Sequence, residues 1–300
     1  MSNSSFTAHS TFDIITYIES APHSHIFEPL YALFITKLLG LGVSSDVAVL
    51  CFQIFLIFLC VSLCLHAKEE RFSSLVIVLM SVFFILSYGN ALRQGASIVL
   101  LLHGFFFYKK KFFIIGTACL LITPLFHFSS VFFIFISFLV LCYNYVFKMK
   151  GLYDYLLLAV FAFLGAYVLG EVISYTTYGS YQDRDYSASA TRVSLGVKLI
   201  PISFIFFISL LVSSHKKETS SASLKYVSQM RFFLLAFVGG LALLDGLPEV
   251  GARVLLFYFG LELCWMLLVN WQKKRRSVVV VLLGYTFAIN AWNILGGFNI

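Results

Sequence analysis

The stretch YGNALRQGASIVLLLHGFFFYKKKFF, residues 88–113, contains two signals that bear on the fold. An apolar run from Gly95 to Tyr108 ends at three consecutive lysines, Lys109–Lys111, and a single arginine, Arg93, precedes the run. An apolar run closed by cations is typical of a membrane span whose lysine-bearing end faces the cytoplasm. Topology therefore explains the lysines, whereas Arg93 lies at the opposite end and needs another explanation.

The composition extends this interpretation to the whole chain. Of the 300 residues, 60% are hydrophobic and 12% are charged, whereas about a quarter of the residues of a soluble domain are charged. We therefore predict an all-α polytopic membrane protein with a single integral membrane domain over residues 1–300. The net charge of +7 is explained by basic residues that flank spans, so no nucleic-acid partner is expected. The six cysteines lie inside apolar runs without metal-type spacing, so neither disulfides nor a metal site is expected.

Apolar runs separated by charged and turn-forming residues predict about 10 transmembrane helices. They lie at 46–66, 72–88, 94–108, 112–126, 129–147, 153–170, 195–213, 231–247, 252–271 and 277–295. A shorter run at 29–43 contains Lys37 and is predicted to be a re-entrant or interfacial segment.

The basic residues are distributed unevenly between the loops that join these spans. Fifteen of the 21 lie in alternate loops, which the positive-inside rule assigns to the cytoplasm. They are Lys68, Arg71, Lys109, Lys110, Lys111, Lys148, Lys150, Lys216, Lys217, Lys225, Arg231, Lys273, Lys274, Arg275 and Arg276. The N-terminal segment 1–28, which has no lysine or arginine and so no signal-peptide pattern, and the loop 171–194 are then extracytoplasmic. Nine of the 14 acids lie on this outer side, and any chemistry is expected there.

Arg93, followed by Gln94, begins a predicted span at the outer face. One explanation is an arginine that reaches lipid phosphates from a helix end. The other is a fork-shaped guanidinium that binds two phosphate oxygens at a helix N-terminus. His127 lies in LFHFSS (125–130), at a break between two spans that end outside. It is either a hydrogen-bonded structural residue or a catalytic or phosphate-binding residue.

The loop YQDRDYS (181–187) places Asp183, Arg184 and Asp185 between tyrosines. This composition is typical of a solvated loop, and aromatic rings with carboxylates and an arginine also form carbohydrate-binding surfaces. On its own the pattern does not distinguish the two.

Glu249 and Arg253 lie four residues apart at the start of a predicted span. They form either a helical ion pair or a site that presents the arginine to a diphosphate. Glu262 lies about 13 Å deeper, at 1.5 Å per residue, and an acid near the midplane is a functional candidate. His103 has a comparable depth on another span, and a contact between Glu262 and His103 is one structural expectation.

Four segments in order along the chain resemble the EpsG/Wzy family, whose members polymerise bacterial surface polysaccharides. They are FDIITYIES…FEPLYALFITKLLGLG (12–42), NALRQGASIVL (90–100), LFHFSSVFF (125–133) and EVGARVLLFYF (249–259). Asp13 and Tyr17 match an Asp-x-x-x-Tyr pattern of the family. Family members usually have a membrane span before this pattern, and none is expected here ahead of residue 13.

The resemblance implies an O-antigen- or capsule-type polysaccharide polymerase in the bacterial cytoplasmic (inner) membrane. Such an enzyme transfers a growing glycan from undecaprenyl diphosphate onto a new lipid-linked repeat unit at the periplasmic or outer face. Arg93 and Arg253 are then expected to bind the diphosphate, because fixed arginines stabilise the negative charge of the leaving group. His127 is expected to be either a third diphosphate contact or the general base. The expected substrate contacts are Asp13, Glu28, Gln94, Asp183, Arg184, Asp185 and Glu249.

The expected partners are an undecaprenyl-diphosphate-linked oligosaccharide, the lipid bilayer and, as a further candidate, a chain-length regulator protein; no cofactor is expected. Two other functions remain open. An O-antigen ligase-type transferase would use the same donor chemistry. A lipid-linked oligosaccharide flippase or transporter would be expected to show internal repeats and several midplane charges.

Overall fold

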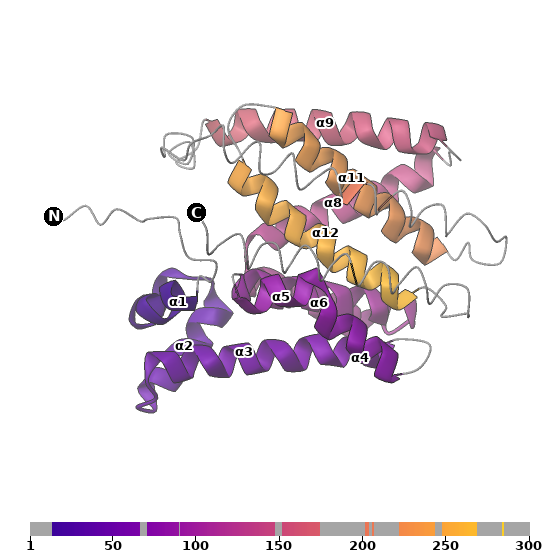
Figure 1. The fold of residues 1–300 in the computed structure, drawn as a ribbon. Helices are drawn as coiled ribbons and strands as arrows, with labels where there is room; N and C mark the ends of the chain where they lie inside the picture. Colours follow the sequence, from indigo (N-terminus) through magenta and orange to yellow (C-terminus); the bar gives the residue numbers. More distant parts are fainter. Residues whose placement is uncertain are drawn as a thin grey trace. The chain divides into compact units, whose positions relative to one another are not determined.

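The fold is known from a computed structural model, which describes residues 14–66, 71–89, 91–147, 152–174, 202–203, 206, 222–243, 248–268 and 284. Within these residues the regular structure consists of helices, without strands (Figure 1). Contacts between Cα atoms divide the chain into two compact units, residues 1–130 with 280–300 (unit 1) and residues 131–279 (unit 2). The all-α prediction is confirmed, and the single membrane domain stays a prediction.

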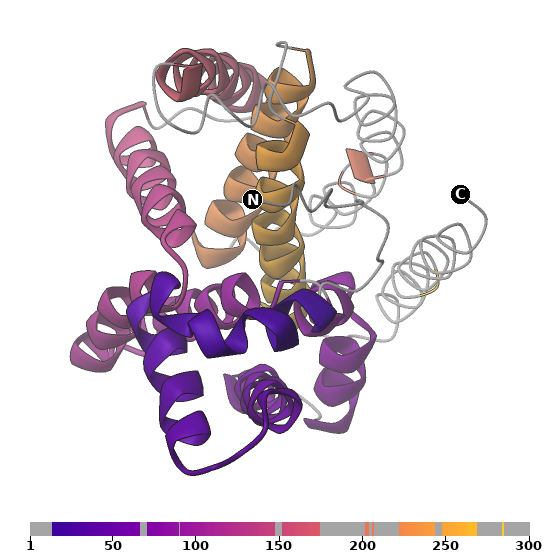
Figure 2. The ribbon, with the colours of Figure 1, turned by 90° about the vertical axis from the view of Figure 1, so that its left-hand side faces the viewer.

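Unit 1 contains nine of the described helical elements, which Figures 1 and 2 show in indigo to magenta. They are α1 (Ile14–Ser20), η1 (Ala21–Ile26), α2 (Pro29–Gly40), α3 (Ser45–Ser62), η2 (Leu63–His66), α4 (Arg71–Met80), α5 (Val82–Gly89), α6 (Leu92–Lys109) and α7 (Phe113–Phe126). The short α2 coincides with the apolar run predicted at 29–43.

Helix α2 has a defined beginning and end. Pro29 occupies the first turn, where its missing N–H costs nothing. At the other end, the N–H of Gly42 donates to the carbonyl of Leu39 (2.9 Å) and that of Val43 to Leu38 (3.2 Å). These two bonds form a Schellman motif, which places Gly42 at a φ of 80°. The motif turns the chain directly into α3.

Helices α6 and α7 form a tightly packed hairpin. A Cβ atom added to Gly104 would lie 3.3 Å from the carbonyl oxygen of Gly116, and one added to Gly116 would lie 2.7 Å from the ring of Tyr108. The small residues therefore allow the two backbones to approach, as is common between membrane helices. The hairpin fixes the beginning of α6, with Arg93, relative to the end of α7, beside His127.

Unit 2 is built from four described helices, α8 (Ser129–Phe147), α9 (Leu152–Ser174), α11 (Ala222–Leu243) and α12 (Pro248–Leu268). Helix α11 packs against both α9 and α12. Its approach to α9 is close, because a Cβ atom on Gly240 would lie 2.9 Å from that of Ala166. Helices α11 and α12 lie side by side in Figure 1.

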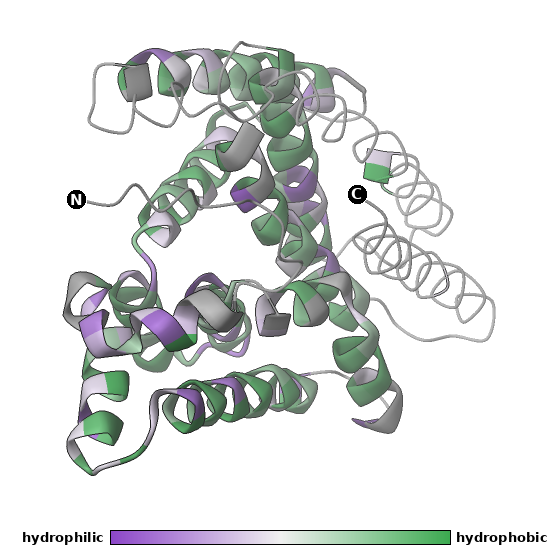
Figure 3. Ribbon diagram, turned by 60° about the vertical axis from the view of Figure 1, so that its left-hand side comes forward, coloured by the Kyte–Doolittle hydropathy of each residue, from purple (hydrophilic) through white to green (hydrophobic). Residues whose placement is uncertain are grey.

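Four helical stretches of the described residues are long and apolar enough to cross a membrane: Ser45–His66, Ser129–Phe147, Tyr153–Val172 and Ala222–Leu243. Hydrophobic residues cover most of the helical ribbons (Figure 3). Only 17% of the span-length window in Tyr153–Val172 is buried inside the structure, so most of its apolar side chains are left to contact lipid. The first three agree with the predicted spans at 46–66, 129–147 and 153–170, the fourth overlaps the one at 231–247, and the total of ten is not confirmed.

The structure corrects the predicted span at 231–247. Helix α11 begins at Ala222, nine residues earlier, and continues through Arg231 to Leu243. Arg231 is completely buried and is not a loop residue. The prediction was wrong because the apolar run was cut at a charge, although a charge inside a span can be stabilised by a partner on another helix.

Candidate functional site

Glu28 is held at the start of α2 by local backbone preferences. The residue before a proline is driven into the extended region, and Glu28, before Pro29, has φ −61° and ψ 145°. Its carbonyl accepts the first bond of the helix, from the N–H of Ala32 at 2.9 Å. A carboxylate at a helix N-terminus is also favoured by the helix dipole. The side chain is 14% exposed, so the chain presents a nearly buried anion there.

Arg93 lies in the first turn of α6, where the helix dipole disfavours a cation. Its Nη1 donates to Oε2 of Glu28, a contact between residues 65 positions apart. The guanidinium carbon also lies 4.3 Å from the ring centroid of Phe27 and 5.7 Å from those of Tyr17 and Tyr31. One carboxylate and three rings therefore stabilise this cation.

His127 lies at the break between α7 and α8. Pro124 lies in the last turn of α7, and His127 has extended backbone angles, φ −161° and ψ 121°. Its carbonyl accepts from the hydroxyl of Ser130 (2.7 Å) and from the Ser130 N–H (3.1 Å), which fixes the turn into α8. The predicted helix break at His127 is confirmed.

The imidazole of His127 meets the same carboxylate that binds Arg93. Its Nδ1 lies 2.7 Å from Oε1 of Glu28, across 99 residues of sequence. Burial raises the pKa of Glu28, but the hydrogen bond with His127 and the charge of Arg93 outweigh this effect and lower the pKa to about 2. The carboxylate is therefore ionised at neutral pH and bridges two side chains of different kinds, a guanidinium and an imidazole.

Two polar groups around this cluster are buried without a hydrogen-bond partner among the described residues. They are Nε of Arg93 and the hydroxyl of Tyr31. Tyr31 is completely buried, and its ring also contacts Phe27 and Tyr17 edge-on. Both groups can donate a hydrogen bond to an anionic or hydroxylated ligand.

Sequence reasoning found Arg93, Glu28 and His127 but not the three aromatic rings around Arg93. Phe27 and Tyr31 lie one residue before and three after Glu28, and this spacing around an acid at a helix start was the available signal. Tyr17 was noticed only as part of a motif. Its contact with Arg93 joins segments 76 residues apart (93 minus 17), which no local pattern reveals.

The other predicted site residues are placed only in part. Gln94 is buried in α6, and Arg253 is exposed in the first turns of α12, in unit 2. Glu249 lies in α12, with its side chain outside the described part. Asp13, Asp183, Arg184 and Asp185 lie outside the described residues. Their assignment to a shared site stays a prediction.

Unit 2 contains a buried ion pair that replaces the expected contact between Glu262 and His103. Nη2 of Arg231 lies 3.1 Å from Oε1 of Glu262 and 3.2 Å from the hydroxyl of Tyr258. His103, in unit 1, instead bonds Ser62 and His66, each at 2.9 Å. Each of the two side chains therefore has its observed partners within its own unit.

A second buried carboxylate joins three helices of unit 2. Oδ2 of Asp154 accepts from the Gln229 side chain at 2.8 Å and lies 3.3 Å from Nζ of Lys225. Gln229 in turn accepts from Asn144 at 2.7 Å. This chain of polar contacts ties α8, α9 and α11 together, and sequence reasoning did not identify it.

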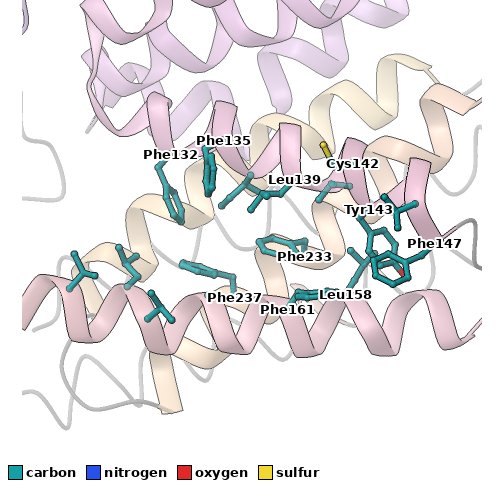
Figure 4. Close-up of a pocket in the computed structure, with 17 residues that line it drawn as sticks. Phe132, Phe135, Leu139, Cys142, Tyr143, Phe147, Leu158, Phe161, Phe233 and Phe237 are labelled. Atoms are coloured by element: carbon teal, nitrogen blue, oxygen red, sulfur yellow. The ribbon is translucent and has the colours of Figure 1, made fainter.

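Unit 2 also has an apolar cavity of about 430 Å³ between α8, α9 and α11 (Figure 4). Its lining includes Phe132, Phe135, Phe161 and Phe237. Such a surface accepts hydrocarbon and offers almost no polar group to a sugar. Among the described residues, no three His, Cys, Asp or Glu side chains are grouped as they would be to hold a metal ion.

Comparison with protein families matches the chain to a known family. The EpsG family matches residues 5–298, nearly the whole chain. The match includes Glu28, Arg93 and His127 and extends over both units. No curated protein and no solved structure matches the chain.

Proposed function

The chain belongs to the EpsG family, and from this membership we propose that it is a membrane glycosyltransferase that polymerises a bacterial surface polysaccharide. The proposed donor is a glycan linked to undecaprenyl diphosphate, and the acceptor is a new lipid-linked repeat unit. The proposed location is the outer face of the bacterial cytoplasmic membrane.

One observation carries the proposal: Arg93 and His127, which lie far apart in the sequence, meet at the carboxylate of Glu28. Glycan transfer from a lipid diphosphate needs a cation for the leaving group and a base for the attacking hydroxyl. The cluster contains one residue of each kind. Because both are 20% exposed or less, the surrounding protein excludes most water and strengthens their electrostatic effect.

In the proposed reaction, a hydroxyl oxygen of the acceptor sugar forms a bond to the anomeric carbon of the donor glycan. The bond between that carbon and the diphosphate oxygen breaks, and the electron pair leaves with the lipid diphosphate. Arg93 stabilises the negative charge that develops on this leaving group. His127 accepts the proton of the hydroxyl.

The role of Arg93 depends on its geometry as well as its charge. Glu28 accepts from Nη1 at one edge of the guanidinium, and the rings of Phe27, Tyr17 and Tyr31 surround the group. Its Nε, which is without a partner among the described residues, can donate to a phosphate oxygen. Arg253 is proposed as the second diphosphate-binding arginine, on the basis of its position in the EVGARVLLFYF segment alone.

The alternative functions predict different lipid-linked products, so a gene-deletion strain distinguishes them. If the protein is a polymerase, the strain attaches one repeat unit to each lipid and makes no longer chains. If it is a ligase or a flippase, no glycan reaches the surface acceptor. Complementation with the wild-type gene restores the ladder of chain lengths in either case and is the control for polar effects.

A further inference from the structure

We infer that Glu28 is a positioning residue that holds His127 in the tautomer whose Nε2 accepts the proton of the acceptor hydroxyl. The inference rests on the proposed function and specifies how its site works. Glu28 was expected from the sequence to contact substrate, which stays a prediction, and the structure shows that it has two protein partners.

The tautomer follows from the chemistry of the two atoms in contact. Oε1 of Glu28 lies 2.7 Å from Nδ1 of His127. An ionised carboxylate can only accept a hydrogen bond, so Nδ1 must carry the hydrogen. A neutral imidazole carries one ring hydrogen, and Nε2 therefore keeps its lone pair. In the described part of the chain, Nδ1 is the ring nitrogen of His127 that has a hydrogen-bond partner.

The carboxylate is held in place by groups other than His127. Its second oxygen, Oε2, binds Arg93, and its backbone is fixed in the extended region before Pro29. Such an arrangement leaves the side chain few alternative rotamers. The imidazole is oriented by an anion that is already anchored, which is how a carboxylate orients the histidine of a hydrolase triad.

The shared carboxylate also couples the two catalytic groups. The hydrogen bond with His127 and the charge of Arg93 together keep Glu28 ionised, and the ionised carboxylate keeps the hydrogen of His127 on Nδ1. The cation that is proposed to bind the diphosphate therefore also maintains the base. This arrangement explains why an arginine at an unfavourable helix position is paired with an acid from a different helix.

The substitution Glu28→Gln tests the inference. The carbonyl of glutamine would accept from Arg93, the stronger donor, and its amide group would then face Nδ1 of His127. An amide N–H needs an acceptor, so the imidazole would change to the tautomer with hydrogen on Nε2. That nitrogen could no longer accept a proton.

Chain extension by the purified protein in nanodiscs gives the first readout. For Glu28→Gln we expect kcat to fall by about 10²–10⁴-fold, as when a triad histidine is held in the wrong tautomer. The KM for the lipid-linked donor should stay within about twofold or decrease, because Arg93 is then less neutralised. Glu28→Asp, which keeps a carboxylate, should recover part of kcat, and Glu19→Gln, at an exposed acid in α1, should match wild type. A matched rise in donor KM and loss of kcat, or an unchanged kcat, would overturn the inference.

Nitrogen-15 NMR of histidine-labelled protein gives a readout that does not depend on activity. Of the seven histidines, His127 is identified by the signals lost in His127→Gln. At alkaline pH, where an imidazole is neutral, we expect Nδ1 to be protonated in wild type and Nε2 in Glu28→Gln. Protonated Nε2 in wild type, or no change in Glu28→Gln, would overturn the inference. If the wild-type protein extends no glycan, the proposed function fails and the nitrogen signals still decide the tautomer.

Discussion

Arg93 combines a charge, a two-pronged hydrogen-bonding group and a flat surface that stacks on rings. The structure uses the charge and the flat surface, because the side chain binds Glu28 through Nη1 and lies over Phe27 at 4.3 Å. A lysine would keep only the charge. The substitution Arg93→Lys therefore tests the shape of this side chain while its charge is kept.

For Arg93→Lys we predict that chain extension falls by about 10²-fold, the typical effect of losing one donor to transition-state charge. The protein level should hold, since the charge next to Glu28 is retained. The measurement is the rate of glycan extension per mole of protein in membranes. Arg71→Lys, at an exposed arginine at the start of α4, is the matched control and should keep wild-type activity. Normal extension by Arg93→Lys would favour the explanation in which the arginine only reaches lipid phosphates.

Glu28 makes the stability of the protein depend on pH in a defined window. Its pKa is lowered from 4.5 to about 2 in the folded protein. A carboxyl group whose folded pKa is depressed stabilises the fold above its unfolded pKa, and this stabilisation is lost as pH falls toward the folded pKa. We predict that the melting temperature in nanodiscs decreases between about pH 4.5 and pH 2, and that Glu28→Gln shows a smaller decrease in this window. An equal decrease in both proteins would contradict the assignment of this stabilisation to Glu28.

The individual site residues could be predicted from the sequence, but the contacts of Arg93 and His127 with Glu28 could not. Arg93 and His127 stood out because a cation and an imidazole interrupt apolar runs, where they are costly. Their common partner comes from a third segment, 65 residues from one and 99 from the other. A pattern within one span contains no information on which distant acid completes the cluster.

At the scale of the helices, the buried pair of Arg231 and Glu262 connects α11 to α12. The guanidinium carbon of Arg231 lies 5.2–5.4 Å from the ring centroids of Phe206, Tyr258 and Trp265. Charges in such a place are stable only together, because one alone would have no counter-charge in a medium of low dielectric constant. The pair therefore fixes the register of α11 against α12.

We predict that Arg231→Met or Glu262→Leu alone destabilises the protein by about 3–5 kcal/mol, the usual cost of leaving one buried charge unpaired. The double variant should be closer to wild type, because it leaves no buried charge. The loss of stability in each of the three variants is measured by thermal unfolding in the same detergent. A loss in the double variant equal to the sum of the two single losses would show that the two side chains stabilise the fold separately.

Helix positions were predicted well at three long apolar runs and poorly where a charge interrupts a helix, and the predicted span at 72–88 is divided at Ser81 into α4 and α5. The spans at 46–66, 129–147 and 153–170 agree with α3–η2, α8 and α9. The start of α11 was misplaced because Arg231 resembles a loop residue when its partner Glu262, 31 residues later, is not known. Hydropathy measures each residue alone, whereas the cost of a charge depends on its neighbours in three dimensions.

At the scale of the whole molecule, the placement of the cluster outside the cytoplasm depends on the distribution of basic residues. Arg231 lies inside a helix, so it no longer counts as a loop residue. Lys225 also lies in α11, in its first turn. The other 13 basic residues assigned to the cytoplasm keep the same bias. The predicted topology is therefore unchanged.

We predict that a cysteine introduced between residues 175 and 190 reacts with an impermeant thiol reagent added outside intact cells. One introduced between 216 and 222 should react only after the membrane is opened. The protein has six cysteines of its own, so the labelling is done in a variant in which these are replaced by serine or alanine and activity is retained. The reverse labelling pattern would place the proposed site on the cytoplasmic side, where a polymerase of this kind could not use it.

The measurement that tests the central claim most directly is chain extension and donor binding by purified His127→Gln. Glutamine keeps a hydrogen-bonding group but cannot accept a proton at neutral pH, so turnover should be lost while the lipid-linked donor still binds with near wild-type affinity. His23→Gln, at an exposed histidine in η1, is the control and should extend chains normally. Weakened donor binding together with lost turnover would make His127 a diphosphate contact instead of the base. Near-normal chain extension by His127→Gln would contradict the account, because it would leave the cluster at Glu28 a structural feature of unit 1.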